Sequence, residues 1–260
     1  GGQVIYLLGY TDQETPNLDA LLEEYGISLT DGLVMEGSSD HYLPNYPYYL
    51  LPDINYSDYT ADLSSRYVLL PFSQGMTELA SGAEGTAEAG LEAEETDDSL
   101  TYESLLTTSA EAYSKTNLES ENMEREEGDI AGPFDLGVVA TKAVSQEERT
   151  EEETDDAENA DAAESGAENE AKLIVFASET LLDEQVDAMV SGGNSTLFLN
   201  VLSQLADHES TVSIEAKSLA VSWLTVTAGS AIFWGLLTVL VLPLFLLCLG
   251  GVIWFQRRKR

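Results

Sequence analysis

The sequence predicts an α/β fold that is followed by one C-terminal transmembrane helix. The first observation is a short apolar run from Val4 to Leu8, which ends at Gly9 and is typical of a buried strand. The second is a helix with recognisable ends directly after it, because a strand followed by a helix begins an α/β pattern. The third is a long apolar stretch near the C-terminus that contains no charged side chain.

The first helix is predicted between Thr15 and Gly26. Thr15 is a typical N-cap residue, and Pro16 is favoured at the first helical position because its missing N–H has no helical partner there anyway. Gly26 is a typical stop residue. Four apolar side chains share one helical face, which we expect to cover the core: Leu18, Leu21, Leu22 and Tyr25.

Short apolar runs predict three more strands. These are Tyr67 to Leu70, which ends at Pro71, then Phe134 to Ala140 and Leu173 to Ala177. The segment from His41 to Tyr59 is rich in tyrosine and proline and has no period. It is therefore predicted to be an ordered loop that packs through its aromatic side chains.

Two helical patterns follow the last strand, at Leu181 to Val190 and Ser195 to Leu205, and Gly192-Gly193 joins them. Two low-complexity stretches interrupt the domain, at residues 81–99 and 145–171. Both consist mainly of Glu, Asp, Ala, Ser, Thr and Gly, so they cannot bury enough apolar surface to fold. We expect disordered acidic inserts there, as solvated surface loops or, alternatively, as a divalent-cation binder or an acidic mimic of a partner.

The transmembrane helix is predicted over residues 231–255, which is long enough to cross a hydrocarbon core of about 30 Å. Its C-terminal flank is the basic tail 256–260, and by the positive-inside rule this tail is cytoplasmic. We therefore expect an extracytoplasmic α/β domain over residues 1–215 and a juxtamembrane segment over 216–230. The lone cysteine, Cys248, lies in the span as a palmitoylation site or, more simply, as a small apolar residue.

Charge and composition exclude several function classes. The 260 residues include 47 acidic and 11 basic ones, for a net charge of −36, so the chain would repel a nucleic-acid backbone. A single cysteine excludes an intramolecular disulfide and a cysteine-based zinc or iron–sulfur site. The sequence contains no P-loop and none of the common hydrolase or metalloprotease motifs. We therefore predict that the protein is not an enzyme.

No catalytic, cofactor-binding or metal-ligating residue is predicted. His41 and His208 lie far apart in the sequence and have no ligand spacing. Asp53, Asn55 and Ser57 imitate the first ligands of an EF-hand loop, but the residues at the glycine and glutamate positions of that loop are Asp58 and Ser64. The chain begins without methionine or a leader, so we expect an N-terminally incomplete piece of a longer protein.

A series of short motifs resembles a known family. In chain order these are Gly1-Gly2, Val4-Ile5-Tyr6-Leu7-Leu8, Pro16-Asn17-Leu18, Gly32-Leu33-Val34, Leu51-Pro52, Leu70-Pro71-Phe72-Ser73-Gln74-Gly75, Leu105-Leu106-Thr107-Thr108-Ser109, Gly132-Pro133-Phe134-Asp135-Leu136-Gly137-Val138 and Gly193-Asn194-Ser195-Thr196-Leu197-Phe198-Leu199-Asn200. Together with the arginine-rich end of the membrane helix, they resemble the GldG-like auxiliary components of ABC-type (ABC-2) transport systems, first associated with gliding motility. The similarity spans nearly the whole chain apart from the acidic inserts.

The resemblance implies a partial flavodoxin-like or amidotransferase-like domain on the outer side of a bacterial cell membrane. It further implies two partners, an ABC-2-type permease and a separate ABC ATPase, with the lipid bilayer contacted through residues 231–255. The predicted function is thus a non-catalytic accessory subunit of an exporter. Two alternatives remain: an acidic cell-surface binding or adhesion protein unconnected to transport, and a surface hydrolase whose Ser, Asp and Glu groups assemble only in the fold.

Overall fold

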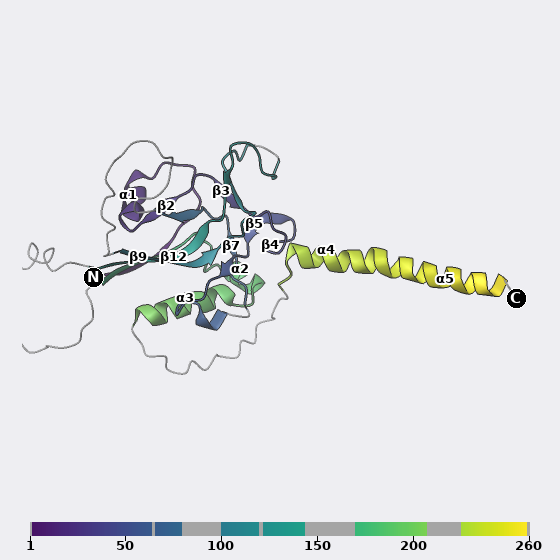
Figure 1. Ribbon diagram of the computed structural model, residues 1–260. Helices are drawn as coiled ribbons and strands as arrows, with labels where there is room; N and C mark the ends of the chain where they lie inside the picture. Colours follow the sequence, from purple (N-terminus) through teal and green to yellow (C-terminus); the bar gives the residue numbers. More distant parts are fainter. Residues whose placement is uncertain are drawn as a thin grey trace, which may run out of the picture.

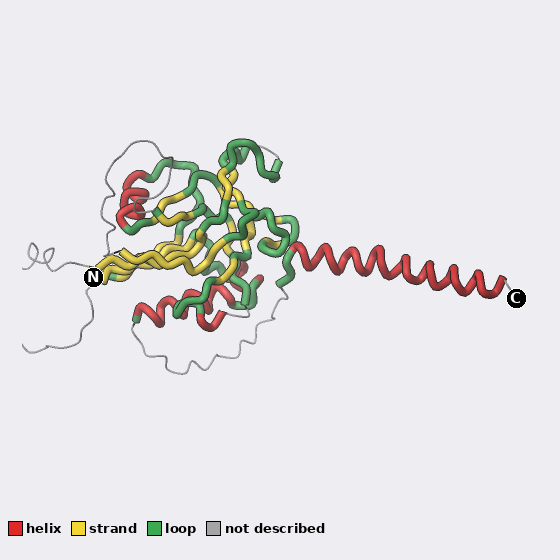
Figure 2. Tube along the Cα trace, in the orientation of Figure 1, coloured by secondary structure: helices red, strands yellow, loops and turns green. Residues whose placement is uncertain are grey.

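The computed structural model describes residues 2–63, 66–79, 100–119, 122–143, 170–206 and 225–258. In Figure 1 these residues form a domain of strands and helices from which one long helix projects, at the side away from the N-terminus. Figure 2 shows the strands running through the middle of the domain with helices on both sides. The predicted α/β class is therefore confirmed.

The main sheet is mixed. Its strands are β1 (Gln3–Leu7), β2 (Ile27–Leu29), β6 (Asp53–Ile54), β8 (Met76–Glu78), β9 (Leu100–Thr107), β12 (Asp135–Ala143) and β13 (Glu170–Phe176). β1 pairs with β13 in parallel. β12 pairs antiparallel with β13, β9 and β8, and β8 pairs antiparallel with β2. β12 is the central strand, since it pairs with β13 along one edge and with β9 along the other.

Three of the predicted strands are confirmed with shifted ends, at β1, β12 and β13. β13 begins at Glu170, where Glu170 and Ala171 pair with Ala143 and Lys142 of β12. The prediction that the second acidic insert extends to residue 171 is therefore wrong by two residues, because the ladder with β12 continues to Glu170. The remainder of both inserts, 81–99 and 145–169, lies outside the described residues.

Two small sheets accompany the main one. The first joins β3 (Leu33–Met35), β10 (Tyr113–Lys115) and β11 (Ile130–Ala131), and the second joins β4 (Tyr42–Leu43), β5 (Tyr46–Leu50) and β7 (Leu70–Pro71). The segment from His41 to Tyr59 is thus wrongly predicted as a loop, because β4 and β5 form a hairpin within it. Its aromatic packing is confirmed: Tyr48 stacks on Phe72 with ring centroids 5.1 Å apart.

The strand predicted at Tyr67 to Leu70 is also wrong in its bounds. Only Leu70 and Pro71 are in β7, where they pair with Leu50 and Tyr49 of β5. Leu69 is held instead by Asn194, whose side-chain oxygen accepts from the Leu69 N–H at 2.8 Å. A side chain from a distant helix therefore satisfies this backbone in place of a neighbouring strand.

The helices cover both sides of the main sheet. α1 (Pro16–Glu24) lies on one side, and α2 (Glu184–Met189) and α3 (Gly193–Leu205) lie on the other (Figure 1). A short 3₁₀ helix, η1 (Ala61–Leu63), also contacts α3. The predicted first helix is confirmed, and Gly26 follows it with a φ of 72°. Thr15 occupies the N-cap, but its hydroxyl donates to Asp19 Oδ1 rather than accepting from the helix backbone.

The core lies between the sheet and these helices. Leu106, Leu136, Val138, Ile174 and Phe176 of the central strands have no exposed surface. The helices add Leu22 from α1 and Leu197 and Val201 from α3, also fully buried. Leu21 was expected on the buried face of α1 but is 47 % exposed. Burying such side chains from both layers is the main source of the domain's stability.

A continuous helix ends the described chain. It comprises α4 (Ala228–Leu236), a π-helical turn η3 (Leu237–Val241) and α5 (Leu242–Arg258), in total 31 residues. It is long and apolar enough to span a membrane. It begins at Ala228, so the last three residues of the predicted juxtamembrane segment 216–230 are already helical, capped by Thr227, whose side chain accepts from the Ser230 N–H. The π turn immediately precedes Pro243, where the helix lacks one N–H donor.

A buried lysine is held by two carboxylates beside β10. The side chain of Lys115 is 2 % exposed, and its Nζ lies 3.7 Å from Asp129 Oδ2 and 3.3 Å from Glu126 Oε2. Burial alone would raise the pKa of Asp129. Hydrogen bonds from the backbone N–H groups of Glu126 and Thr116, together with Lys115, outweigh burial and hold this pKa below its ordinary value of 3.8.

Asp129→Asn should lower the free energy of unfolding by about 2 kcal/mol at neutral pH, because it removes one charged partner from a buried cation. Since the folded pKa of Asp129 is depressed, its contribution is full above the unfolded pKa and is lost as the pH falls through the folded value. Urea unfolding of both proteins at pH 7 and pH 3 measures this. The difference should shrink at pH 3, and exposed Glu127→Gln should change neither value. A difference that is equal at both pH values would contradict this origin.

Candidate functional site

The residues singled out in the sequence do not assemble into a site. His41 Nε2 lies 3.3 Å from Asp53 Oδ1, and its Nδ1 lies 3.1 Å from Ser38 Oγ. Asn55 turns away from Asp53 and donates through Nδ2 to Thr107 Oγ1 and the Ser104 carbonyl. The side chains of Asp53 and Asn55 therefore do not form the cation site that the EF-hand-like spacing of positions 53, 55 and 57 would require. His208 lies outside the described residues, and Cys248 is exposed on α5.

A polar network inside the main sheet contains a serine and an aspartate, the kinds of group that the hydrolase alternative requires. Ser104 Oγ donates to Asp135 Oδ1 at 2.5 Å, and Tyr102 donates to Asp135 Oδ2 at 2.7 Å. Burial raises the pKa of Tyr102 far above its usual range, and the hydrogen bond to Asp135 is the second largest cause of this increase. His41, the one histidine in the described residues, bonds to Ser38 and Asp53 and not to Ser104. The network therefore ties β6, β9 and β12 together and does not form a nucleophile with its base.

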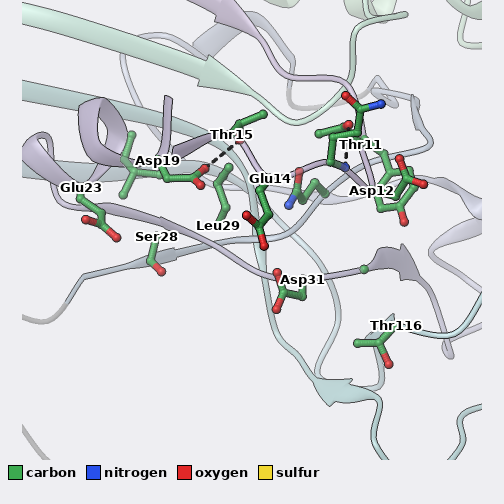
Figure 3. Close-up of a pocket in the computed structure, with 15 residues that line it drawn as sticks. Thr11, Asp12, Glu14, Thr15, Asp19, Glu23, Ser28, Leu29, Asp31 and Thr116 are labelled. Atoms are coloured by element: carbon green, nitrogen blue, oxygen red, sulfur yellow. Dashed lines mark hydrogen bonds between the residues drawn. The ribbon is translucent and has the colours of Figure 1, made fainter. Parts of the chain in front are cut away.

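One hollow in the domain is an acidic pocket of about 430 Å³. Figure 3 shows its side chains, which come from the loop after β1, from α1, from β2 and the turn after it, and from the residue after β10. Five carboxylates line it: Asp12 and Glu14 from the loop, Asp19 and Glu23 from α1, and Asp31 from the turn. Its lining contains no lysine, arginine or histidine. We refer to it as the acidic pocket.

The local sequence explains how these carboxylates gather. Asp19 and Glu23 are four residues apart, so they lie on the same face of α1. The loop that precedes the helix carries Asp12 and Glu14 and is fixed by a bond from the Gln13 N–H to Thr11 Oγ1. Asp31 is brought from the far side by the turn after β2, where Ser114 Oγ donates to its carbonyl at 2.6 Å. None of these residues was predicted as a site from the sequence; the i, i+4 spacing of Asp19 and Glu23 is the one local signal of it.

Gln74 is the buried polar member of the pocket wall. Its side chain lines the pocket, and the residue is 8 % exposed. Its Nε2 donates to the Thr30 carbonyl at 3.1 Å, but its Oε1 is buried and accepts no hydrogen bond. A buried acceptor without a donor costs about 1–3 kcal/mol. Tyr10 also lines the pocket, and burial, followed by the charge of Asp12, raises its pKa.

A second, apolar hollow of about 600 Å³ lies at the base of the C-terminal helix. It is lined by Leu43, Pro44, Tyr46, Gln185, Ala188, Met189, Thr225 and Val226. Thr225 Oγ1 donates to the Met189 carbonyl at 2.6 Å, and the Gly229 N–H donates to the Ser39 carbonyl at 2.7 Å. The domain is therefore joined to the start of the helix by direct hydrogen bonds, with an apolar surface beside the junction.

Comparison with known proteins yields no family. No protein-family profile matches the sequence, and no curated protein is similar to it. Among solved structures, the chain is similar to one described as "mmIFT52 N-terminal domain", at 15 % identity and a TM-score of 0.44, covering 82 % of this chain and 68 % of that one.

Proposed function

We propose that the protein is a non-catalytic, membrane-anchored accessory subunit of an ABC-type export system. In this proposal the domain is a partial flavodoxin-like or amidotransferase-like unit, for which the parallel pairing of β1 with β13 is the supporting feature. It lies outside the cytoplasm of a bacterial cell beside an ABC-2-type permease. A separate ABC ATPase hydrolyses ATP, and the basic end of the single membrane span faces the cytoplasm.

The observation that carries the proposal is the helix Ala228–Arg258. Most of the large apolar side chains that the structure describes on it are exposed; for example, Val239 and Leu247 are 77 % and 74 % exposed. Exposing this many large apolar side chains to water is unfavourable, so the helix requires lipid or other apolar helices around it. Arg257 and Arg258 in its last turn support the orientation, because basic residues favour the cytoplasmic side.

The junction between domain and helix supports a role close to the membrane surface. The bonds from Thr225 and Gly229 leave little freedom at the base of the helix, so the apolar hollow beside it faces the interfacial region if the helix spans the bilayer. A rigid junction would let a movement of permease helices reach the outer domain. ATP hydrolysis on another chain would drive that movement.

Copurification tests this proposal. The full-length protein is isolated from native membranes in mild detergent, and the proteins that accompany it are identified by mass spectrometry. We expect a P-loop ATPase and a polytopic permease. A variant with Gly250→Leu and Gly251→Leu should lose both, because the small size of these glycines permits close helix contact and, outside the local helix backbone, nothing lies within 4 Å of a Cβ built on either. The control Val241→Leu should retain both partners.

Recovery of the protein alone, with its helix intact, would contradict the subunit proposal. It would favour the second function, a cell-surface binding protein unconnected to transport. The acidic pocket is the observation that favours this second function, since it is a built hollow that requires no other chain.

A further inference from the structure

We propose that the domain rests on the membrane through an uncharged face beside the helix, and that this face contacts zwitterionic phospholipid of the adjacent leaflet. The face consists of the β4–β5 hairpin, residues 42–50, and the side of α2 that lines the apolar hollow next to it. We call it the hairpin face. This inference rests on the membrane span of the proposed function and does not depend on the exporter partners.

The hairpin carries no charge although the chain is very acidic. Residues 42–52 contain no aspartate, glutamate, lysine, arginine or histidine, whereas the whole chain has 47 acidic side chains. Four of these residues are tyrosines, whose amphipathic rings are favoured at the head-group level of a bilayer. One of them, Tyr46, is 50 % exposed. This segment can therefore approach lipid without the cost of desolvating a charge.

α2 presents an uncharged side to the same hollow. Gln185, Ala188 and Met189 are three and four residues apart, so they share one face of the helix, and all three line the hollow. Asp187 is held away from it. Its carboxylate accepts from the Ser195 N–H at 3.0 Å and from the Ser195 hydroxyl at 2.5 Å. The charge of Asp187 is thus turned toward α3, and the hairpin face stays apolar.

The helix places this face at the level of the head groups. Trp234 and Trp254 are 60 % and 57 % exposed, and their spacing along a helix is about 30 Å, the thickness of the hydrocarbon core. Tryptophan is enriched at both borders of that core. Ala228 then lies about 9 Å outside the border at Trp234, at the outer edge of the head-group region. The Gly229 N–H donates to the Ser39 carbonyl, which brings the chain just before β4 to the same level (Figure 1).

Continuity with the span favours lipid over another protein as the occupant. Thr225 and Val226 line the hollow and lead directly into the helix, so a spanning helix brings its own bilayer to this face. The Thr225 hydroxyl already donates to the Met189 carbonyl and needs no other acceptor. Zwitterionic head groups suit the domain, because a chain of net charge −36 is repelled by anionic lipid.

The experiment is fluorescence quenching of the full-length protein in phosphatidylcholine vesicles. Cys248→Ser removes the native thiol, and Tyr46→Cys, Met189→Cys or Leu21→Cys then carries a nitrobenzoxadiazole fluorophore. Leu21 is the matched control, since it is 47 % exposed and belongs to α1, which lies away from the membrane helix (Figure 1). A nitroxide on the lipid head group should quench the labels at residues 46 and 189 at least threefold more than the label at residue 21.

A label on the native Cys248, measured with a nitroxide in the acyl chain, separates two kinds of failure. If Cys248 is quenched while residues 46 and 189 are quenched no more than residue 21, the helix spans the bilayer but lipid does not cover the hairpin face. That result would overturn the inference and leave the face open to another protein. If Cys248 is not quenched either, the membrane anchoring of the proposed function fails together with the inference.

Charge variants test the chemistry of the face with the label kept at residue 189. Tyr46→Glu should lower the quenching there at least twofold, because a carboxylate disfavours contact with lipid. Leu21→Glu adds the same charge on α1 and should leave the quenching unchanged. Tyr46→Trp keeps an aromatic ring against Tyr48 and Tyr49, so it should retain the quenching and guards against a folding defect of the hairpin. Equal quenching in Tyr46→Glu and Tyr46→Trp would overturn the proposed contact.

Discussion

Gly193→Ala is expected to destabilise the domain by about 3 kcal/mol, the upper end of what overpacking a tight interior costs. A Cβ built on Gly193 would lie 2.0 Å from the carbonyl oxygen of Tyr67 and 3.1 Å from its carbonyl carbon. Both are backbone atoms, so no side-chain rotation can relieve the contact. The first turn of α3 would have to withdraw from the chain segment that leads into β7.

That withdrawal is opposed by the residue next in sequence. Asn194 is fully buried, and its side chain accepts from the Leu69 N–H and donates to the carbonyls of Leu69 and Leu181, at 2.8, 2.8 and 3.0 Å. Moving α3 away would therefore leave buried backbone groups of Leu69 unpaired, which adds to the cost. Gly193→Ala thus tests whether the close approach of α3 to the Tyr67 backbone is required for stability.

The measurement is urea unfolding of the full chain in nonionic detergent, followed by circular dichroism. The neighbouring glycine provides the control. Gly192 has a φ of 83° but no atom within 4 Å of a built Cβ, so Gly192→Ala should cost only the left-handed backbone penalty of about 1 kcal/mol. Similar losses in the two variants would show that close approach to the Tyr67 backbone is not the main constraint at Gly193.

The elements predicted correctly are those whose own residues indicate them, through helix-end residues or through a run of apolar side chains. The first helix has a threonine, a proline and a glycine at the positions where helices begin and end, and α1 follows them closely. β1, β12 and β13 are apolar runs, and their centres were found although their ends were not. The ends depend on pairing, as at Glu170, where an acidic residue continues a ladder that its own composition does not favour.

Elements that are stabilised by contacts with residues far away in the sequence were not predicted. β9 reads Leu-Thr-Tyr-Glu-Ser-Leu-Leu-Thr, with polar residues in its first half, and it is ordered by pairing with β12 and β6. The acidic pocket combines residues 10–32 with Gln74 and Thr116, which only the folded sheet brings together. Sequence periodicity describes neighbours along the chain, so the Asp19 and Glu23 spacing was open to it, but in so acidic a chain such a pair does not stand out, and the unpaired Oε1 of Gln74 has no sequence signal.

The second large effect is expected in the C-terminal helix. A variant with Leu240→Arg and Leu247→Arg should no longer be retained in membranes. An arginine at the centre of a spanning helix costs about 2.5–3.5 kcal/mol on insertion, and the two side chains lie in the middle of an uncharged stretch. After extraction of cell membranes with alkaline carbonate, the original protein should stay in the pellet and the variant should appear in the supernatant or be degraded.

Two controls separate anchoring from folding. Gln256→Arg adds one positive charge next to Arg257 and Arg258, where a basic residue is favoured, so it should stay in the pellet. Leu240 and Leu247 are 57 % and 74 % exposed, so the double variant should keep the urea unfolding curve of the outer domain. Retention of the double variant in the pellet would mean that the helix does not hold the protein in the membrane. The exporter-subunit proposal would then lose its principal support.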